Sequence, residues 1–126
     1  MKSLHTCIRV KDLEKSIDFY EDALGYKEIN RSDFPDAKFT LVFLQLPGDD
    51  YELELTYNYD QEEPYDLGNG YGHIALGVED LEGKHKELSD KGYNVTELKG
   101  LRGDPNYFFV TDPDGYRIEI IRLKGE

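Results

Sequence analysis

The sequence has few of the features that extracellular or membrane-spanning proteins need. Its 126 residues include one cysteine, Cys7, so the chain can form no internal disulfide and no cysteine-based zinc site. No segment approaches the roughly 20 apolar residues of a transmembrane helix. Residues 1–10 carry neither a long apolar run nor a signal-cleavage pattern. We therefore expect a cytoplasmic protein.

Positive charge is also scarce. Lys and Arg number 15 against 27 Asp and Glu, which gives a formal net charge of -12. Nucleic acids and anionic membrane surfaces both require a basic face, so we expect neither as a partner. An anionic ligand would have to be met by a local group of cations. With 38% hydrophobic and 13% aromatic residues, the chain nevertheless has enough apolar material for a folded core.

The sequence contains an internal repeat. The segment HTCIRVKDLE at residues 5–14 aligns with HIALGVEDLE at residues 73–82, and YELEL at 51–55 aligns with YRIEI at 116–120. Each half therefore opens with a histidine on an apolar segment and closes with a glutamate on another. Two copies are too few for a solenoid, so the repeat indicates a duplicated module within a single domain, residues 1–126.

Each half has the pattern of a strand, a helix and two further strands. Apolar alternation predicts the strands, at residues 4–10, 38–46, 51–58, 71–78, 106–111 and 115–123. Asp12 and Asp80 are expected to cap the helices at their N-termini, and Gly25 and Gly92 to end them.

The remaining segments complete this organisation. Residues 27–33 and 93–98 leave room for one more short strand in each half. The polar segment 59–70 contains Gly and Pro and is expected to link a first module, about 1–58, to a second, about 71–126.

Strand alternation places four polar side chains on the faces that point away from the helices. These are His5, Glu54, His73 and Glu119. Imidazole and carboxylate suit divalent Ni, Co, Zn, Fe or Mn. A lone histidine or glutamate in a strand is usually structural or exposed, but here both occur twice, in register with the repeat. The residues alone leave a metal site and a structural role both open.

Two other side chains are interpreted as packing residues. His85 takes the place of Ile17 on the inner face of the second helix, so we expect it to pack or to lie at the surface. Cys7 shares a strand face with His5 and could line a pocket, but a passive role as a small apolar residue is favoured.

Three segments together resemble a known family over essentially the whole chain. They are HTCIRVKDLEKSIDFYEDALGY at the start, LELTYN followed by GNGYGHIALGVED in the centre, and DPDGYRIEII near the end. The sequence resembles glyoxalase I (lactoylglutathione lyase) of the short bacterial type, in the vicinal oxygen chelate superfamily. The central segment is the most specific, because the final one is shared by much of that superfamily.

This resemblance implies a fold, a metal site and an assembly. The fold would be α+β, with two βαβββ modules whose mixed sheets form a cleft. His5, Glu54, His73 and Glu119 fall on the four metal-ligand positions of the family. The family assembles as a homodimer with the site at the subunit interface, so the first two ligands would come from one chain and the last two from the other.

The resemblance also implies a reaction. The substrate would be the hemithioacetal of methylglyoxal and glutathione, and the product S-lactoylglutathione. Glu119 is our first choice for the base that moves the proton, with Glu54 serving the opposite face. Arg9 and Asn58 fall on glutathione-binding positions, and Arg102 is a candidate for a second glutathione carboxylate.

Metal identity and competing functions complete the expectations. The short chain with His5 resembles the branch activated by nickel or cobalt rather than zinc. One alternative is a superfamily dioxygenase, which needs two His and one Glu at iron. Another is a metal-free antibiotic-binding protein, which has no need for four ligands. The same isomerisation with a different thiol also remains open.

Overall fold

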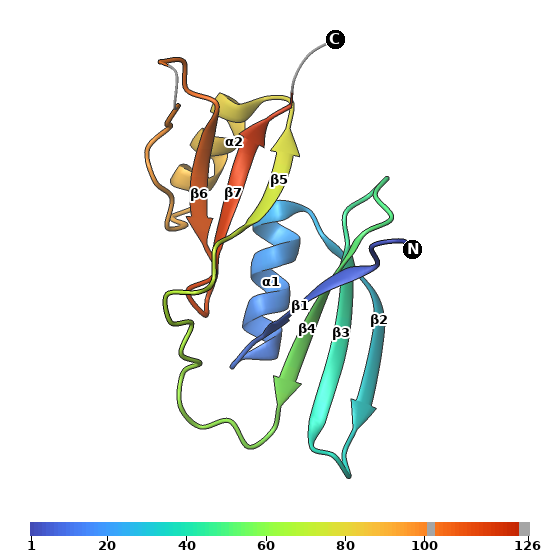
Figure 1. Ribbon diagram of the computed structural model, residues 1–126. Helices are drawn as coiled ribbons and strands as arrows, with labels where there is room; N and C mark the ends of the chain where they lie inside the picture. Colours follow the sequence, from blue (N-terminus) through green and yellow to red (C-terminus); the bar gives the residue numbers. More distant parts are fainter. Residues whose placement is uncertain (101–102, 124–126) are drawn as a thin grey trace. The chain divides into compact units, whose positions relative to one another are not determined.

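The computed structural model describes residues 1–100 and 103–123, shown in Figure 1. The chain divides into two compact units, Met1–Asp66 and Leu67–Glu126. The division falls inside the segment 59–70. Each unit contains one copy of the repeat and is described by itself.

The first unit is a four-stranded sheet with one helix. Its elements are β1 (His5–Arg9), α1 (Leu13–Leu24), β2 (Lys27–Phe34), β3 (Phe39–Gln45) and β4 (Glu52–Asn58). The strand order is β1-β4-β3-β2, in which β1 pairs with β4 in parallel and the other pairs are antiparallel. The strand predicted at 27–33 is present, so this unit is a complete βαβββ module.

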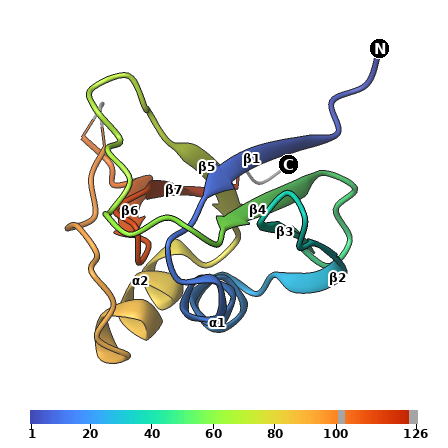
Figure 2. The same ribbon diagram turned by 90° about the horizontal axis from the view of Figure 1, so that it is seen from below.

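Helix α1 lies along one face of this sheet (Figure 2). The Asp12 side chain accepts a hydrogen bond from the backbone N–H of Lys15 (3.2 Å), and Gly25 ends the helix with a φ of 78°. The buried face of α1 includes Leu13, Ile17, Tyr20 and Leu24. Its partners are the buried residues of the strands: Ile8, Val42, Leu44, Leu53 and Leu55. Each such side chain contributes about 1.5–3 kcal/mol of burial free energy.

The second unit repeats the plan in a smaller form. Its elements are β5 (Ile74–Val78), α2 (Leu81–Asp90), β6 (Tyr107–Thr111) and β7 (Arg117–Arg122). The strand order is β5-β7-β6, with β5 and β7 parallel and β6 and β7 antiparallel. Its core consists of Leu81, Leu88, Phe108, Val110, Ile118 and Ile120, all at most 1% exposed.

The additional strand for which residues 93–98 leave room in this unit does not form. Val95 makes an isolated bridge to Val110 of β6, and Lys99, just after the segment, makes another to Tyr107. Thr96 accounts for the interruption. Its hydroxyl accepts the backbone N–H of Phe109 (2.9 Å), and its carbonyl accepts a hydrogen bond from Nε2 of His85 (2.9 Å). Side chains thus occupy groups that a continuous ladder would use. The other predicted elements are present, with ends displaced by up to three residues.

Candidate metal centre

His5 and Glu54 face each other across two parallel strands. The register pairs Cys7 of β1 with Glu54 of β4, and His5 lies two residues earlier on the same face. His5 Nε2 lies 3.4 Å from Glu54 Oε1. The imidazole is 40% exposed and the carboxylate 13%, so the histidine is open to solvent while the glutamate is held in the sheet.

His73 and Glu119 repeat this arrangement in the second unit. Ala75 of β5 pairs with Glu119 of β7, and His73 comes just before the first residue of β5. His73 Nε2 lies 3.3 Å from Glu119 Oε1, and the two side chains are 41% and 17% exposed. The internal repeat therefore produces two copies of one His–Glu pair, with the same register and almost the same geometry.

An aromatic ring supports each histidine. Phe43 lies edge-on to His5, with ring centroids 5.5 Å apart, and Phe109 lies edge-on to His73 at 5.3 Å. Phe43 pairs with Glu54 across the antiparallel hairpin, and Phe109 pairs with Glu119 in the same way. Each pair is thus a three-residue unit in which the ring restricts the orientation of the imidazole.

The donor chemistry of the two pairs fits a divalent metal. Distances of 3.4 and 3.3 Å are longer than the usual 2.7–3.2 Å of an N–H···O hydrogen bond. Two donors that each lie about 2.1 Å from one cation would be roughly 3.0–3.4 Å apart. Within residues 1–100 and 103–123, no group of three or more His, Cys, Asp or Glu could hold a metal. Each pair would therefore supply two ligands of a larger shell.

The second oxygen of Glu54 has a partner in its own strand. Thr56 Oγ1 donates a hydrogen bond to Glu54 Oε2 (2.8 Å), and Cys7 Sγ lies 3.2 Å from the same hydroxyl. Desolvation by burial raises the pKa of the Cys7 thiol. A protonated thiol can act as the donor to Thr56, so the three side chains form a chain that ends at Glu54.

Glu119 lies in a different environment. It borders a cavity of about 350 Å³ whose lining consists of His73, Asn106, Tyr107, Phe109, Glu119 and Ile121. The guanidinium of Arg117 lies over the Phe109 ring, 3.9 Å from its centroid. The Glu119 side chain itself is 17% exposed.

The predicted glutathione contacts are distributed over strand ends. Arg9 ends β1, on the same face of the strand as His5, and Asn58 ends β4, on the face of Glu54. Asn58 Nδ2 donates a hydrogen bond to the hydroxyl of Tyr65 (2.9 Å). Arg102 lies outside the described residues.

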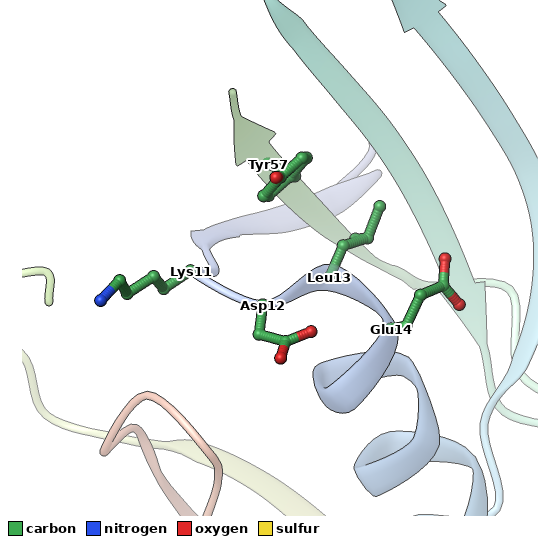
Figure 3. A pocket seen from close by; sticks show the side chains of 5 residues that line it. All are labelled: Lys11, Asp12, Leu13, Glu14 and Tyr57. Atoms are coloured by element: carbon green, nitrogen blue, oxygen red, sulfur yellow. The ribbon is translucent and has the colours of Figure 1, made fainter. Parts of the chain in front are cut away.

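The first unit also contains a cavity, but its lining side chains are not arranged for catalysis. Figure 3 shows its five lining side chains, with Tyr57 of β4 opposite the start of α1 and Lys11 pointing away from it. Its volume is about 570 Å³. The carboxylate of Asp12 caps α1, and that of Glu14 accepts a hydrogen bond from Arg31 (3.0 Å). Both acids therefore have structural partners, and we assign no chemistry to this cavity.

Comparison with known proteins identifies the class of the chain. Residues 2–120 match the sequence profile of the Glyoxalase/Bleomycin resistance protein/Dioxygenase superfamily. The lactoylglutathione lyase of Neisseria meningitidis is 46% identical over 130 residues, covering 99% of this chain and 93% of the relative.

Two solved structures extend the comparison. The trypanothione-dependent glyoxalase I of Leishmania major has a TM-score of 0.86 at 39% identity, covering 97% of this chain and 86% of that one. Glyoxalase I from Zea mays has a TM-score of 0.88 at 35% identity, covering 98% of this chain and 45% of that one. The chain therefore belongs to this superfamily and, within it, to the glyoxalase I (lactoylglutathione lyase) family.

Two predictions are thereby confirmed: the α+β superfamily fold and an enzyme of the lactoylglutathione lyase class. In the described part of the chain, neither helix has the length and apolar character that a membrane crossing requires.

Sequence reasoning missed three residues of the site. Phe43 and Phe109 occupy equivalent positions opposite the two glutamates. Aligning the two β-hairpins in the sequence would have revealed this equivalence. Thr56 lies two residues after Glu54 and therefore on the same strand face. Its hydrogen bond to Glu54 depends on a side-chain rotamer, which the strand pattern does not specify.

Proposed function

We propose that this protein isomerises the hemithioacetal of methylglyoxal and glutathione to S-lactoylglutathione, and so detoxifies methylglyoxal. The observation that carries this function is the duplicated His–Glu pair, at 3.4 Å in one unit and 3.3 Å in the other. A dioxygenase site needs three protein ligands, and a metal-free drug-binding site needs none. The relatives named lactoylglutathione lyase favour the isomerase over both alternatives.

The proposed metal shell combines two subunits. His5 and Glu54 of one chain would join His73 and Glu119 of its partner, because each pair alone supplies only half of a four-ligand shell. The protein would act as a homodimer with two equivalent sites, each chain contributing one domain made of the two modules.

The reaction moves a proton between neighbouring carbons. A bound divalent metal would stabilise the negative charge that develops on the two substrate oxygens. Glu119 accepts the proton of the C–H bond at C1 and returns it at C2, and the hydroxyl proton passes from the oxygen on C1 to the oxygen on C2. Substrate and product are isomers, so no oxidant or reductant is needed. Glu54 would serve the opposite face.

Local cations must bind the thiol part of the substrate, because the net charge of -12 repels an anion. Arg9 offers a guanidinium for a glutathione carboxylate, and Asn58 an amide for its peptide groups. Arg102 is proposed for a second carboxylate. Glutathione is an intracellular thiol, which supports a cytoplasmic location.

The decisive experiment adds nickel, cobalt or zinc to metal-free protein with methylglyoxal and glutathione, and follows thioester formation by ultraviolet absorbance. We expect nickel or cobalt to give the highest rate. Trypanothione replaces glutathione in a parallel assay, because the related Leishmania major enzyme depends on it. Absence of thioester with every metal and both thiols would contradict the proposed function.

A further inference from the structure

The two glutamates of the candidate site differ in what holds them. Glu54 uses both carboxylate oxygens: Oε1 lies 3.4 Å from His5 Nε2, and Oε2 accepts the Thr56 hydroxyl at 2.8 Å. Because the Thr56 hydrogen is directed at Glu54, its oxygen is left to accept a hydrogen bond from the Cys7 thiol at 3.2 Å. Glu54 is therefore held at Oε2 by a hydrogen bond and faces His5 with Oε1.

The equivalent positions around Glu119 carry no such donors. The register places Ala75 beside Glu119, where Cys7 stands beside Glu54. Ile121 stands two residues after Glu119, at the position that Thr56 has in the first unit. Within residues 1–100 and 103–123, the side-chain partner of Glu119 is His73. Glu119 also lines the cavity of the second unit.

We propose that Thr56 is a positioning residue, whose hydroxyl holds the Glu54 carboxylate in one orientation and makes it the more rigidly held of the two glutamate ligands. This inference rests on the proposed function and deepens it. A hydrogen bond to a charged group is stronger than one between neutral groups, so it restricts rotation of the carboxylate. Glu119 has no hydroxyl at the equivalent position, because Ile121 stands there, so its carboxylate is less restricted than that of Glu54.

A purely structural role for Thr56 is the competing explanation, since β-branched residues are favoured in strands. Two substitutions separate the explanations. Thr56→Val keeps the shape and β-branching and removes only the hydroxyl. Thr56→Ser keeps the hydroxyl and removes the methyl group. A packing role predicts that Val is tolerated and Ser is harmful, whereas a positioning role predicts the reverse.

The test measures metal binding by isothermal titration calorimetry with Ni²⁺ and metal-free protein. Loss of a residue that supports a ligand typically weakens metal affinity about 10–100-fold. We expect that loss for Thr56→Val, and an affinity close to wild type for Thr56→Ser. Thr6→Val is the matched control, because the Thr6 hydroxyl bonds to Tyr51 (2.8 Å) rather than to the His–Glu pair.

The visible spectrum of Co²⁺-loaded protein provides a second measurement. Release of Glu54 should change the spectrum of Thr56→Val but not that of Thr6→Val. Wild-type affinity and spectrum in Thr56→Val, or failure of Thr56→Ser to restore them, would overturn the proposal. Failure of the wild type to form thioester would instead remove the proposed function, while the calorimetry would still report on Thr56.

Discussion

The two modules carry the same His–Glu pair but support it differently. His5 with Glu54 and His73 with Glu119 share the register, the distance and an edge-on phenylalanine. The residues beside the glutamates differ, because the first module has a hydrogen-bonding threonine where the second has an isoleucine. The two modules thus share the histidine, the glutamate and the phenylalanine, while the side chains next to the glutamate differ in their ability to form hydrogen bonds.

The modules also differ in how they complete their sheets. In the first, β2 (Lys27–Phe34) pairs with β3 over its whole length, with one register shift between Glu28 and Asn30. In the second, residues 93–99 make two isolated bridges to β6 and are held by the hydrogen bond from His85 to the Thr96 carbonyl. His85 stands where the first module has buried Ile17, so a polar contact replaces an apolar one at the same place on the helix.

The largest expected effect comes from removing both histidines, which tests whether the two pairs act together. His5→Ala/His73→Ala should bind no divalent metal tightly and should lose metal-dependent activity, because two carboxylates alone are left. Calorimetry and the thioester assay measure these losses, and circular dichroism checks the fold. Full metal-dependent activity in the double variant would mean that the assigned pairs are not the site.

Comparing the two glutamates one at a time tests their division of roles. Glu119→Gln keeps the side-chain shape but loses basicity, so kcat at full metal occupancy should fall by roughly 10²–10⁴-fold. Glu54→Gln should lower kcat less and metal affinity more, because this carboxylate is the one that Thr56 holds. Metal content is measured in each sample before the rate. Equal losses of kcat in the two variants would remove the distinction between them.

Mixing two inactive variants tests whether each site takes one pair from each chain. A heterodimer of His5→Ala and Glu119→Gln subunits would have one site with both lesions and one intact site. After complete exchange, the mixture should regain roughly a quarter of wild-type activity by random assortment of a two-fold symmetric dimer. Native mass spectrometry verifies the exchange. No recovery after verified exchange would place all four ligands within one chain.

The smallest expected effect concerns the histidine that is particular to the second module. His85→Leu keeps much of the apolar contact with Phe108, whose ring centroid lies 4.9 Å away, but leaves the Thr96 carbonyl without its donor. The free energy of unfolding should fall by about 1 kcal/mol, with an unchanged denaturant slope. Metal affinity should stay at the wild-type value. Unchanged or increased stability would show that the His85 bond contributes nothing.

Much of this architecture is readable from the sequence. The repeat and the strand alternation predict both His–Glu pairs. Successive side chains of a strand point to opposite faces of the sheet, so the sequence spacing fixes which side chains share a face. The ends of α1 are also predictable from the sequence, because Asp12 and Gly25 act on the backbone next to them.

Other features depend on contacts that no local pattern specifies. The interruption at 93–98 arises because His85 and the Thr96 side chain bond to backbone groups that a strand would use. The tie between Thr56 and Glu54 depends on the side-chain rotamers within one strand. In both places, the structure depends on which of several possible hydrogen-bond partners a group takes. The alternation of apolar residues does not specify that partner.

The shared register of the two pairs has a consequence for the history of the chain. In each module, two parallel strands carry the pair. The residue directly opposite the glutamate lies two positions after the histidine on the neighbouring strand. One insertion or deletion within either strand would turn its donor to the other face. Length changes should therefore be tolerated in the hairpin turns and selected against within the strands. Each module carries one complete His–Glu pair, so duplication and fusion of a single module would have joined two halves that already had the pair.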